Sequence, residues 1–223
     1  IMTQFGAIDV AQDIFFDRWT AKAYNAASTN SKAPATPTLT NNSCLAAVSA
    51  DTKTKFTDGA GSYFYAVSAL NQYGESALQI CNTTIKAVAA TESLDITFAA
   101  GVGTYAATGF RIYRTEKNTA NYTTAKFYPI IEVTLAEHTA GYDDATGGVI
   151  RDRNRTLPNT HVAFVMDPTA EMWEYVQLAA TMKIDFAITT LARRFAVVNY
   201  GTPILYMPGK ISVIHNIGRD LTA

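Results

Sequence analysis

Apolar and polar positions alternate with a period of two through the middle of the chain, which predicts β-strands. The clearest case is SYFYAVSALN at residues 62–71. One side of this strand is expected to carry Tyr63, Tyr65, Val67 and Ala69, and the other Phe64, Ala66, Ser68 and Leu70. Asn71 to Gly74 supply a turn, and LQICNTTIKAV at 78–88 is the return strand, with Leu78, Ile80 and Ile85 directed inward.

Further strands are predicted at CLAAVSA (44–50), SLDITFA (93–99), GFRIYRTEK (109–117) and KFYPIIEVTL (126–135). Pro129 lacks a backbone N–H, so the last of these strands is expected at a sheet edge. A Gly-rich turn, AGYDDATGG, then closes the region. Strands at this spacing, without a long helical pattern between them, predict a β-sandwich.

The pattern changes after residue 156. Asp167-Pro168 is a typical helix start, and an apolar stripe at helical spacing follows, formed by Met172, Tyr175, Val176, Ala179 and Met182. FAVVNYGTPILYMPGKISVIHNIG then predicts three strands, separated by turns at 201–203 and 208–209. This region is therefore expected to be α+β.

Composition divides the chain into three segments, and the first of them has two parts. Residues 1–24 are apolar without a clean period and are interpreted as an arm, and residues 25–40 (NAASTNSKAPATPTLT) as an extended linker. We expect an N-terminal arm and linker at 1–40, a sandwich at 41–155 and an α+β part at 156–223.

The charge is balanced. The 223 residues are 48% hydrophobic and 17% charged with a net charge of −1, so no nucleic-acid or anionic-membrane surface is indicated. The longest apolar runs fall short of the roughly 20 residues of a membrane span, and we expect no membrane partner. IMTQFGAIDV lacks the features of a secretion signal, and Ile1 is interpreted as a processing site or the start of what was read rather than as a translation start.

Cys44 and Cys81 are the two cysteines, both in apolar, strand-like contexts. Two buried thiols that pack as small hydrophobic groups are the favoured interpretation, with a disulfide as the alternative.

The motifs of catalysis and metal binding are missing. His138, His161 and His215 lie far apart without ligand spacing, and no Gly-x-Ser-x-Gly elbow occurs. Asp143-Asp144 could join Asp152 in binding calcium, but adjacent acids in a Gly-rich turn more often face water. We therefore expect no enzyme, no metal and no cofactor.

Several of the predicted strands resemble a fibronectin type III module. GSYFYAVSALNQYGESAL is similar to strand F and its following turn, with Tyr63 as the corner tyrosine, SLDITFA is similar to strand B, and ATGFRIYRTEK is similar to strand C. FYPIIEVT and GYDD stand where the next strands would be. The order F, G, B, C implies a circularly permuted immunoglobulin-like sandwich, and a permuted domain suits insertion into a host domain because its ends lie close together.

The flanking segments resemble tailed-bacteriophage major capsid proteins. LARRFAVVNYGTPILYMPGKISVIHNIG is similar to the last strands of that coat fold, and MTQFGAIDVAQDIFF followed by APATPT is similar to the segment leading into an immunoglobulin-like insertion. No long spine helix is predicted, and the flanks are about half the size of a complete coat fold. The resemblance implies a mainly β chain: a permuted immunoglobulin-like β-sandwich inserted in the C-terminal portion of an α+β coat fold.

The function implied by the resemblance is structural. Copies of the chain would assemble into an icosahedral capsid in the bacterial host cytoplasm, with other capsid or decoration proteins as further partners. Packaged DNA would be enclosed without sequence-specific binding, and the sandwich would project outward from the virion. Arg193 and Arg194 are the candidates for inter-subunit ion pairs, with a solvated strand start as the alternative.

A cell-surface or virion-fibre binding module is the alternative function. Sandwich loops would then recognise a glycan or a protein, with Tyr105 and Tyr122 as the candidate contacts.

Overall fold

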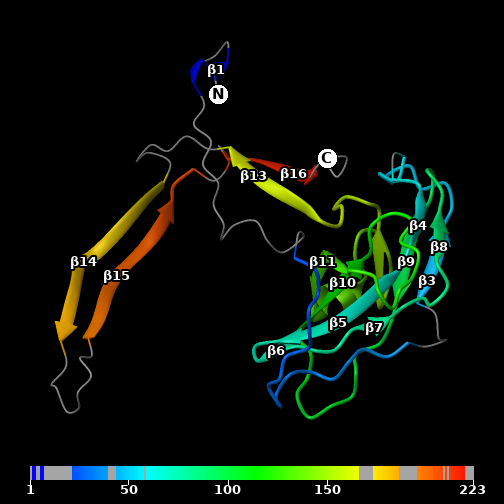
Figure 1. Cartoon of the computed structure of the whole chain (residues 1–223), viewed down its shortest axis with the longest axis horizontal. Helices are drawn as coiled ribbons and strands as arrows, with labels where there is room; N and C mark the ends of the chain where they lie inside the picture. Colours follow the sequence, from blue (N-terminus) through cyan, green and yellow to red (C-terminus); the bar gives the residue numbers. More distant parts are fainter. Residues whose placement is uncertain are drawn as a thin grey trace. The chain divides into compact units, whose positions relative to one another are not determined.

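The computed structural model describes residues 2–3, 6–7, 22–39, 44–57, 59–165, 173–185, 195–207, 209 and 211–218, and its fold is mainly β (Figure 1). The elements are β1 Met2–Thr3, β2 Gly6–Ala7, β3 Leu45–Val48, β4 Gly61–Tyr63, β5 Tyr65–Asn71, β6 Gly74–Glu75, β7 Gln79–Ile80, β8 Lys86–Val88, β9 Ser93–Thr97, β10 Gly109–Arg114, β11 Tyr128–Thr134, α1 Leu135–Ala140, β12 Val149–Asp152, β13 Thr160–Val165, β14 Trp173–Asp185, β15 Phe195–Leu205 and β16 Ser212–Gly218.

The chain divides into two compact units. The first consists of residues 1–162 and 215–223, and we call it the two-sheet unit. The second consists of residues 163–214. It contains the paired strands β14 and β15, and we call this pair of strands the ribbon. The predicted boundaries at 40/41 and 155/156 stay predictions.

The two-sheet unit is built on two antiparallel sheets. The larger has the order β11-β10-β5-β6, with β7 also paired to β5, and the smaller has the order β12-β9-β3. β4 and β8 form a further antiparallel pair. β11 stands at the end of its sheet and a register shift occurs at Pro129, so the predicted edge position is confirmed.

One hydrophobic core lies between the two sheets. It draws on β5, β10 and β11 of the larger sheet and on β9 and β12 of the smaller. Its main residues are Tyr65, Val67, Ala69, Leu94, Ile96, Phe98, Phe110, Ile112, Ile130, Val133 and Ile150. The alternation predicted for residues 62–71 is confirmed, because Tyr63, Tyr65, Val67 and Ala69 enter this core while Phe64 and Ala66 enter a second cluster.

The second cluster covers the other face of the larger sheet. Phe64 and Tyr113 are packed there against Tyr24 and Tyr122. The Tyr24 and Tyr113 rings meet edge to face with centroids 5.6 Å apart, and the Tyr24 N–H donates to the Phe127 carbonyl at 2.8 Å. The segment interpreted as a linker is bonded to the unit near both of its ends. The Ser28 N–H donates to the carbonyl of Glu75 on β6 at 2.8 Å, and Thr38 bridges to Ala99, just after β9.

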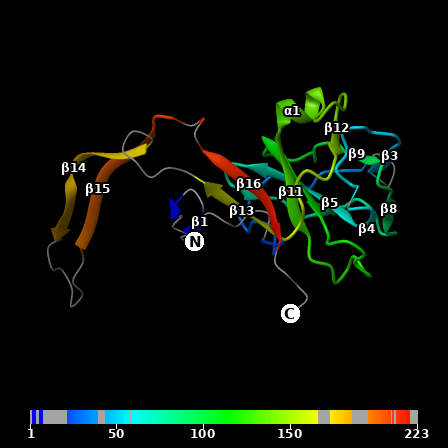
Figure 2. The same cartoon turned by 90° about the horizontal axis from the view of Figure 1, so that it is seen from above.

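The predicted return strand at 78–88 is interrupted. β7 pairs with β5 and β8 pairs with β4, and Ile85 between them is exposed rather than directed inward. The short helix α1 was not predicted. Its capping box joins Thr134 and Glu137, because the Thr134 hydroxyl accepts from the Glu137 N–H and the Glu137 carboxylate accepts from the Thr134 N–H. Figure 2 shows α1 at one end of this unit, near β12.

The favoured interpretation of the cysteines was wrong. Cys44, just before β3, and Cys81, just after β7, form a disulfide with an S–S distance of 2.01 Å. They are 2% and 0% exposed, so the bond lies inside the core and crosslinks the two sheets. Thirty-seven positions separate the two residues, and this long-range approach leaves no local pattern in the sequence.

The predicted helix at 168–182 was also wrong over the residues that are described. Residues 173–185 form the strand β14, which pairs antiparallel with β15. Register shifts between Gln177 and Ala179, and between Ala179 and Met182, insert extra residues into β14. Because of these bulges, Val176, Ala179 and Met182 lie on one face of the ribbon although they are three positions apart in the sequence. Residues three positions apart also share a face of a helix, so the sequence pattern resembled a helical stripe.

β15 continues through the predicted turn at 201–203. Pro203 pairs with Tyr175 and Gly201 pairs with Gln177. A Cβ added to Gly201 would come within 2.6 Å of the Tyr175 ring, so the tyrosine covers the glycine and the strand continues. The C-terminal strand predicted beyond it is confirmed as β16, which pairs with β13.

Candidate functional site

A buried ion pair organises the end of the two-sheet unit. Arg114 on β10 is 0% exposed, and its Nη1 donates to Asp152 Oδ2 at 2.7 Å. The Tyr65 hydroxyl donates to the same carboxylate oxygen at 2.8 Å, and Arg114 Nη2 donates to Asn154 Oδ1 at 2.6 Å. The guanidinium also lies 4.8 Å from the centroid of the Tyr63 ring.

The electrostatics of this group favour a structural role. Burial opposes the charged form of Arg114, but Asp152 outweighs it and raises the pKa of Arg114 above its usual value. Burial and the Asp152 charge raise the pKa of Tyr65 well above 10, so its hydroxyl stays protonated near neutral pH. Because its members are buried and bonded to one another, the group holds β5, β10 and β12 together.

A second set of charges surrounds the first. Arg153 binds Asp51 at 2.7 Å, Asp143 at 2.8 Å and Asp144 at 2.9 Å. Burial would raise the pKa of Asp51, but the hydrogen bond from Arg153 outweighs it and the pKa falls to about 2. Arg151 on β12 binds Asp95 on the neighbouring strand β9 at 2.6 Å.

The acids considered for calcium are therefore engaged by cations. Asp143 and Asp144 bind Arg153, and Asp152 binds Arg114. Within the described part of the chain no group of three His, Cys, Asp or Glu side chains could hold a metal ion.

These contacts anchor the segment Arg151-Asp152-Arg153-Asn154-Arg155. The Asn154 amide donates to the Lys55 carbonyl, and the Asn216 amide donates to the Arg155 carbonyl at 2.8 Å. The sequence analysis missed this network. Its signal was the RDRNR run itself, in which basic residues alternate with shorter polar ones. Asp143 and Asp144 are close to it in sequence, but Arg114 lies 38 positions from Asp152 and Asp51 lies 102 positions from Arg153.

His138 is buried rather than available for binding. Its ring stacks on Phe98 at 4.6 Å and lies 4.8 Å from the Phe110 ring. Nε2 is buried without a hydrogen-bond partner among the described residues, and burial lowers the pKa of His138. His215 is an exposed residue of β16.

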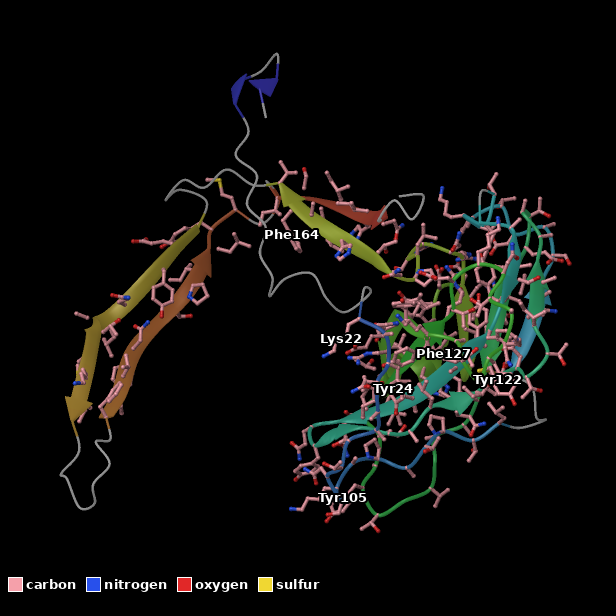
Figure 3. All side chains as sticks on the ribbon, viewed as in Figure 1. Lys22, Tyr24, Tyr105, Tyr122, Phe127 and Phe164 are labelled. Carbon is pink, nitrogen blue, oxygen red and sulfur yellow. A yellow bond between two sulfur atoms is a disulfide. The ribbon has the colours of Figure 1, made fainter. Side chains whose placement is uncertain are left out.

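Tyr105 and Tyr122 do not form one surface. Tyr122 packs on Phe64 with ring centroids 5.9 Å apart, whereas Tyr105 lies in a loop elsewhere on the unit (Figure 3). Tyr105 is 37% exposed and meets Tyr73, 38% exposed, edge to face at 6.0 Å. Lys32 lies 5.3 Å from the Tyr73 ring centroid. Tyr73, which the sequence analysis missed, is thus the true neighbour of Tyr105.

The ribbon exposes many large apolar side chains. Leu178 is 90% exposed and Val197 is 62% exposed, and they are not isolated cases. The other exposed apolar side chains of β14 and β15 are Tyr175, Val176, Met182, Ile184, Phe195, Tyr200 and Leu205. Soluble proteins rarely leave so many large apolar groups together in water, so the ribbon has the character of an interface.

Arg193 and Arg194 lie outside the described residues. Among the residues described, no helix is long and apolar enough to cross a membrane. Comparisons of this chain with protein-family models, with curated proteins and with solved structures found no match.

Proposed function

We propose that this chain is a structural protein of a tailed-phage virion, which assembles with copies of itself into the icosahedral shell around the genome. Its proposed fold is the C-terminal portion of a major capsid protein with a permuted immunoglobulin-like insertion. Interfaces and symmetry perform this function, so it requires no catalytic group.

The observation that carries the proposal is the ribbon. Two strands of 13 and 11 residues pair with each other and expose large apolar side chains on both faces. An isolated two-stranded ribbon is marginal in water, and its stability requires a third element or a covering surface. A protein whose working state is an assembly supplies that cover from its neighbours.

The size of the ribbon favours several neighbours over a single partner. A strand of 11 residues is about 37 Å long and a pair of strands is about 10 Å wide, which gives roughly 400 Å² for each face. A stable pairwise interface needs about 800 Å² on each partner. One face is too small for that. In a lattice both faces are covered, and many weak contacts made at once give a stable assembly.

Two features of strand arrangement and one hydrogen bond in the two-sheet unit support the immunoglobulin-like part. The strand compared with F, β5, lies between the strands compared with C and G, β10 and β6–β7, while the strand compared with B, β9, belongs to the other sheet. The Tyr63 hydroxyl donates to the Gly59 carbonyl four positions upstream, as a corner tyrosine does. The order of these strands along the chain is that of a permuted module.

Negative-stain electron microscopy of native particles containing this chain tests the proposal. Icosahedral shells of uniform diameter are the expected result. A chain that sediments as a single monomeric species at all concentrations, and never occurs in particles, overturns it.

A second experiment tests whether Arg193 and Arg194 make inter-subunit contacts. Arg193→Ala/Arg194→Ala chains are examined beside the wild type, and weaker assembly is expected if the arginines form ion pairs between subunits.

One observation favours the alternative function of a cell-surface or virion-fibre binding module. The Cys44–Cys81 disulfide indicates that the folded protein spends time in an oxidising environment, such as the outside of a cell or of a released virion. Tyr73, Tyr105 and Lys32 would then be the contact residues for a glycan. A glycan array distinguishes the two functions, because a binding module should bind and should lose binding with Tyr105→Ala, while a purely structural shell protein should not bind.

A further inference from the structure

Each cysteine of the buried disulfide is fixed by its own sheet. The Thr97 N–H donates to the Cys44 carbonyl at 2.8 Å, which ties Cys44 to β9 of the smaller sheet. The Cys81 N–H donates to the Tyr65 carbonyl at 2.8 Å, which ties Cys81 to β5 of the larger sheet. These bonds hold the two cysteines whether or not their sulfur atoms are joined. Their Cα atoms lie 5.1 Å apart, within the range of ordinary disulfides.

The core around the pair does not depend on the bond. Cys44 and Cys81 are buried in the same cluster as Val67 and Leu94, which come from the two different sheets. A free cysteine packs as a small hydrophobic group, so two thiols fill the same places in this core as the disulfide does. The two-sheet unit is therefore expected to fold with both cysteines reduced.

The bond joins two segments at the margins of the sheets. β3, which follows Cys44, is the last strand in the order β12-β9-β3, and β7, which precedes Cys81, has only two residues. Short strands and strands at the end of a sheet have few contacts and open more readily than central strands. A crosslink between Cys44 and Cys81 therefore closes both segments at once.

We infer that Cys44 and Cys81 form a redox lock: they are two thiols while the chain folds and assembles, and a disulfide after the particle leaves the host cell. The inference rests on the proposed function, which places assembly in a bacterial cytoplasm, where thiols are kept reduced. The disulfide of the structure belongs to an oxidising environment. A pair that oxidises after folding meets both conditions.

The oxidant of this step is a low-molecular-weight disulfide. The thiolate of one cysteine attacks it, which releases one thiol and leaves a mixed disulfide on the protein. The thiolate of the other cysteine then attacks the protein sulfur and releases the second thiol. The cysteines are oxidised by two electrons, and their two protons go to the released thiols. Because both cysteines are buried, oxidant and reductant reach them only when a marginal segment opens.

Thiol counting inside host cells and in released particles tests the inference. Cells are lysed directly into denaturant with a polyethylene glycol maleimide, which shifts a chain on a denaturing gel once for each free thiol. Chains from inside the cell should carry two labels, and chains from released particles none. The matched control is Cys44→Ala, which leaves Cys81 without its partner and should carry one label in both samples.

The same gels separate the lock from the shell. Particles whose chains are already unlabelled inside the cell overturn the inference and leave the proposed function standing, since the bond then forms during folding. Released particles whose chains still carry two labels overturn it as well, because the disulfide is then absent.

Oxidation of the purified full chain tests the lock without particles. The chain is folded under reductant, the reductant is removed, and oxidised glutathione is added. Circular dichroism should show the same β-structure before and after, while both thiols are lost. A reduced chain that stays unfolded until the oxidant is added, or a folded chain that keeps its thiols, overturns the inference. A chain that folds reduced and then oxidises, but never occurs in particles, supports the lock and overturns the shell.

Discussion

The two units of this chain differ in how they shield apolar side chains from water. In the two-sheet unit, the strands β5, β9 and β10 bury Tyr65, Leu94 and Phe110 completely. In the ribbon, strands of greater length leave Phe195, Val197 and Tyr200 more than half exposed. Both regions are rich in apolar residues, so composition does not account for the difference. It depends on whether a second layer of the same chain covers the strands.

This difference separates intrinsic stability from stability that depends on partners. A sheet covered by a second sheet gains roughly 25 cal/mol for each Å² of apolar surface it buries. A two-stranded ribbon without cover gains little and remains marginal. The two-sheet unit is therefore expected to be stable in a single chain, and the ribbon is expected to become stable on assembly.

Hydrogen exchange of backbone amides measures this contrast directly. In the free chain, amides of β5 and β10 should exchange at least about 1,000-fold more slowly than those of β14 and β15, because opening the core requires global unfolding. In assembled particles the ribbon amides should become protected. Equal protection of the two regions in a free monomer would show that the ribbon does not need a partner.

Arg114→Leu should destabilise the two-sheet unit by about 3 to 5 kcal/mol, because it leaves Asp152 charged and buried without its cation. The matched control is Arg155→Leu, since the Arg155 side chain is largely exposed and its pair with Asp143 should contribute about 1 kcal/mol or less. Urea unfolding followed by circular dichroism compares them. Equal losses for the two variants would contradict the structural role of the buried pair.

Replacing Cys44 and Cys81 by Ala should cost about 3 to 4 kcal/mol, because the disulfide closes a loop of 37 residues and restricts the unfolded chain. The loss should appear in the two-sheet unit and leave exchange in the ribbon unchanged. Reduction of the wild type should reproduce it. Thiol titration of the denatured, unreduced protein is the check, and two free thiols per chain would rule out the disulfide.

A smaller effect is expected from pH. Burial lowers the pKa of His138 relative to the unfolded chain, so the unfolded state binds the proton more tightly. The resulting stability is fully present above the unfolded pKa of about 6.5 and is lost as the pH falls below it. The pKa of Asp51 is about 2, so that carboxyl titrates in a lower range.

Thermal unfolding between pH 7.5 and 5 measures the contribution of His138, and His138→Gln is the control. The wild type should lose stability across this interval, while the variant should lose less. An identical slope for both proteins would mean that His138 is protonated as easily in the folded state as in the unfolded state.

Strand prediction succeeded where the signal was local. The alternation at 62–71 correctly assigned Tyr65 and Val67 to the core because the period of two follows from backbone geometry alone. Pro129 was placed at an edge because it lacks a donor. The assignment of β14 failed because its bulges are defined against β15, and single-strand periodicity cannot show where a partner strand skips a residue.

The sequence by itself determined that this chain is mainly β and which side of β5 faces the core, since these properties depend on neighbouring residues. The tertiary structure decided the remainder: the partner of Cys44, the ion pair of Arg114 with Asp152, and the strand rather than helix at 173–185. Each of these depends on residues tens of positions apart. Burial and pairing between distant segments then outweigh local preference, because a strand is stabilised mainly by the surface against which it packs.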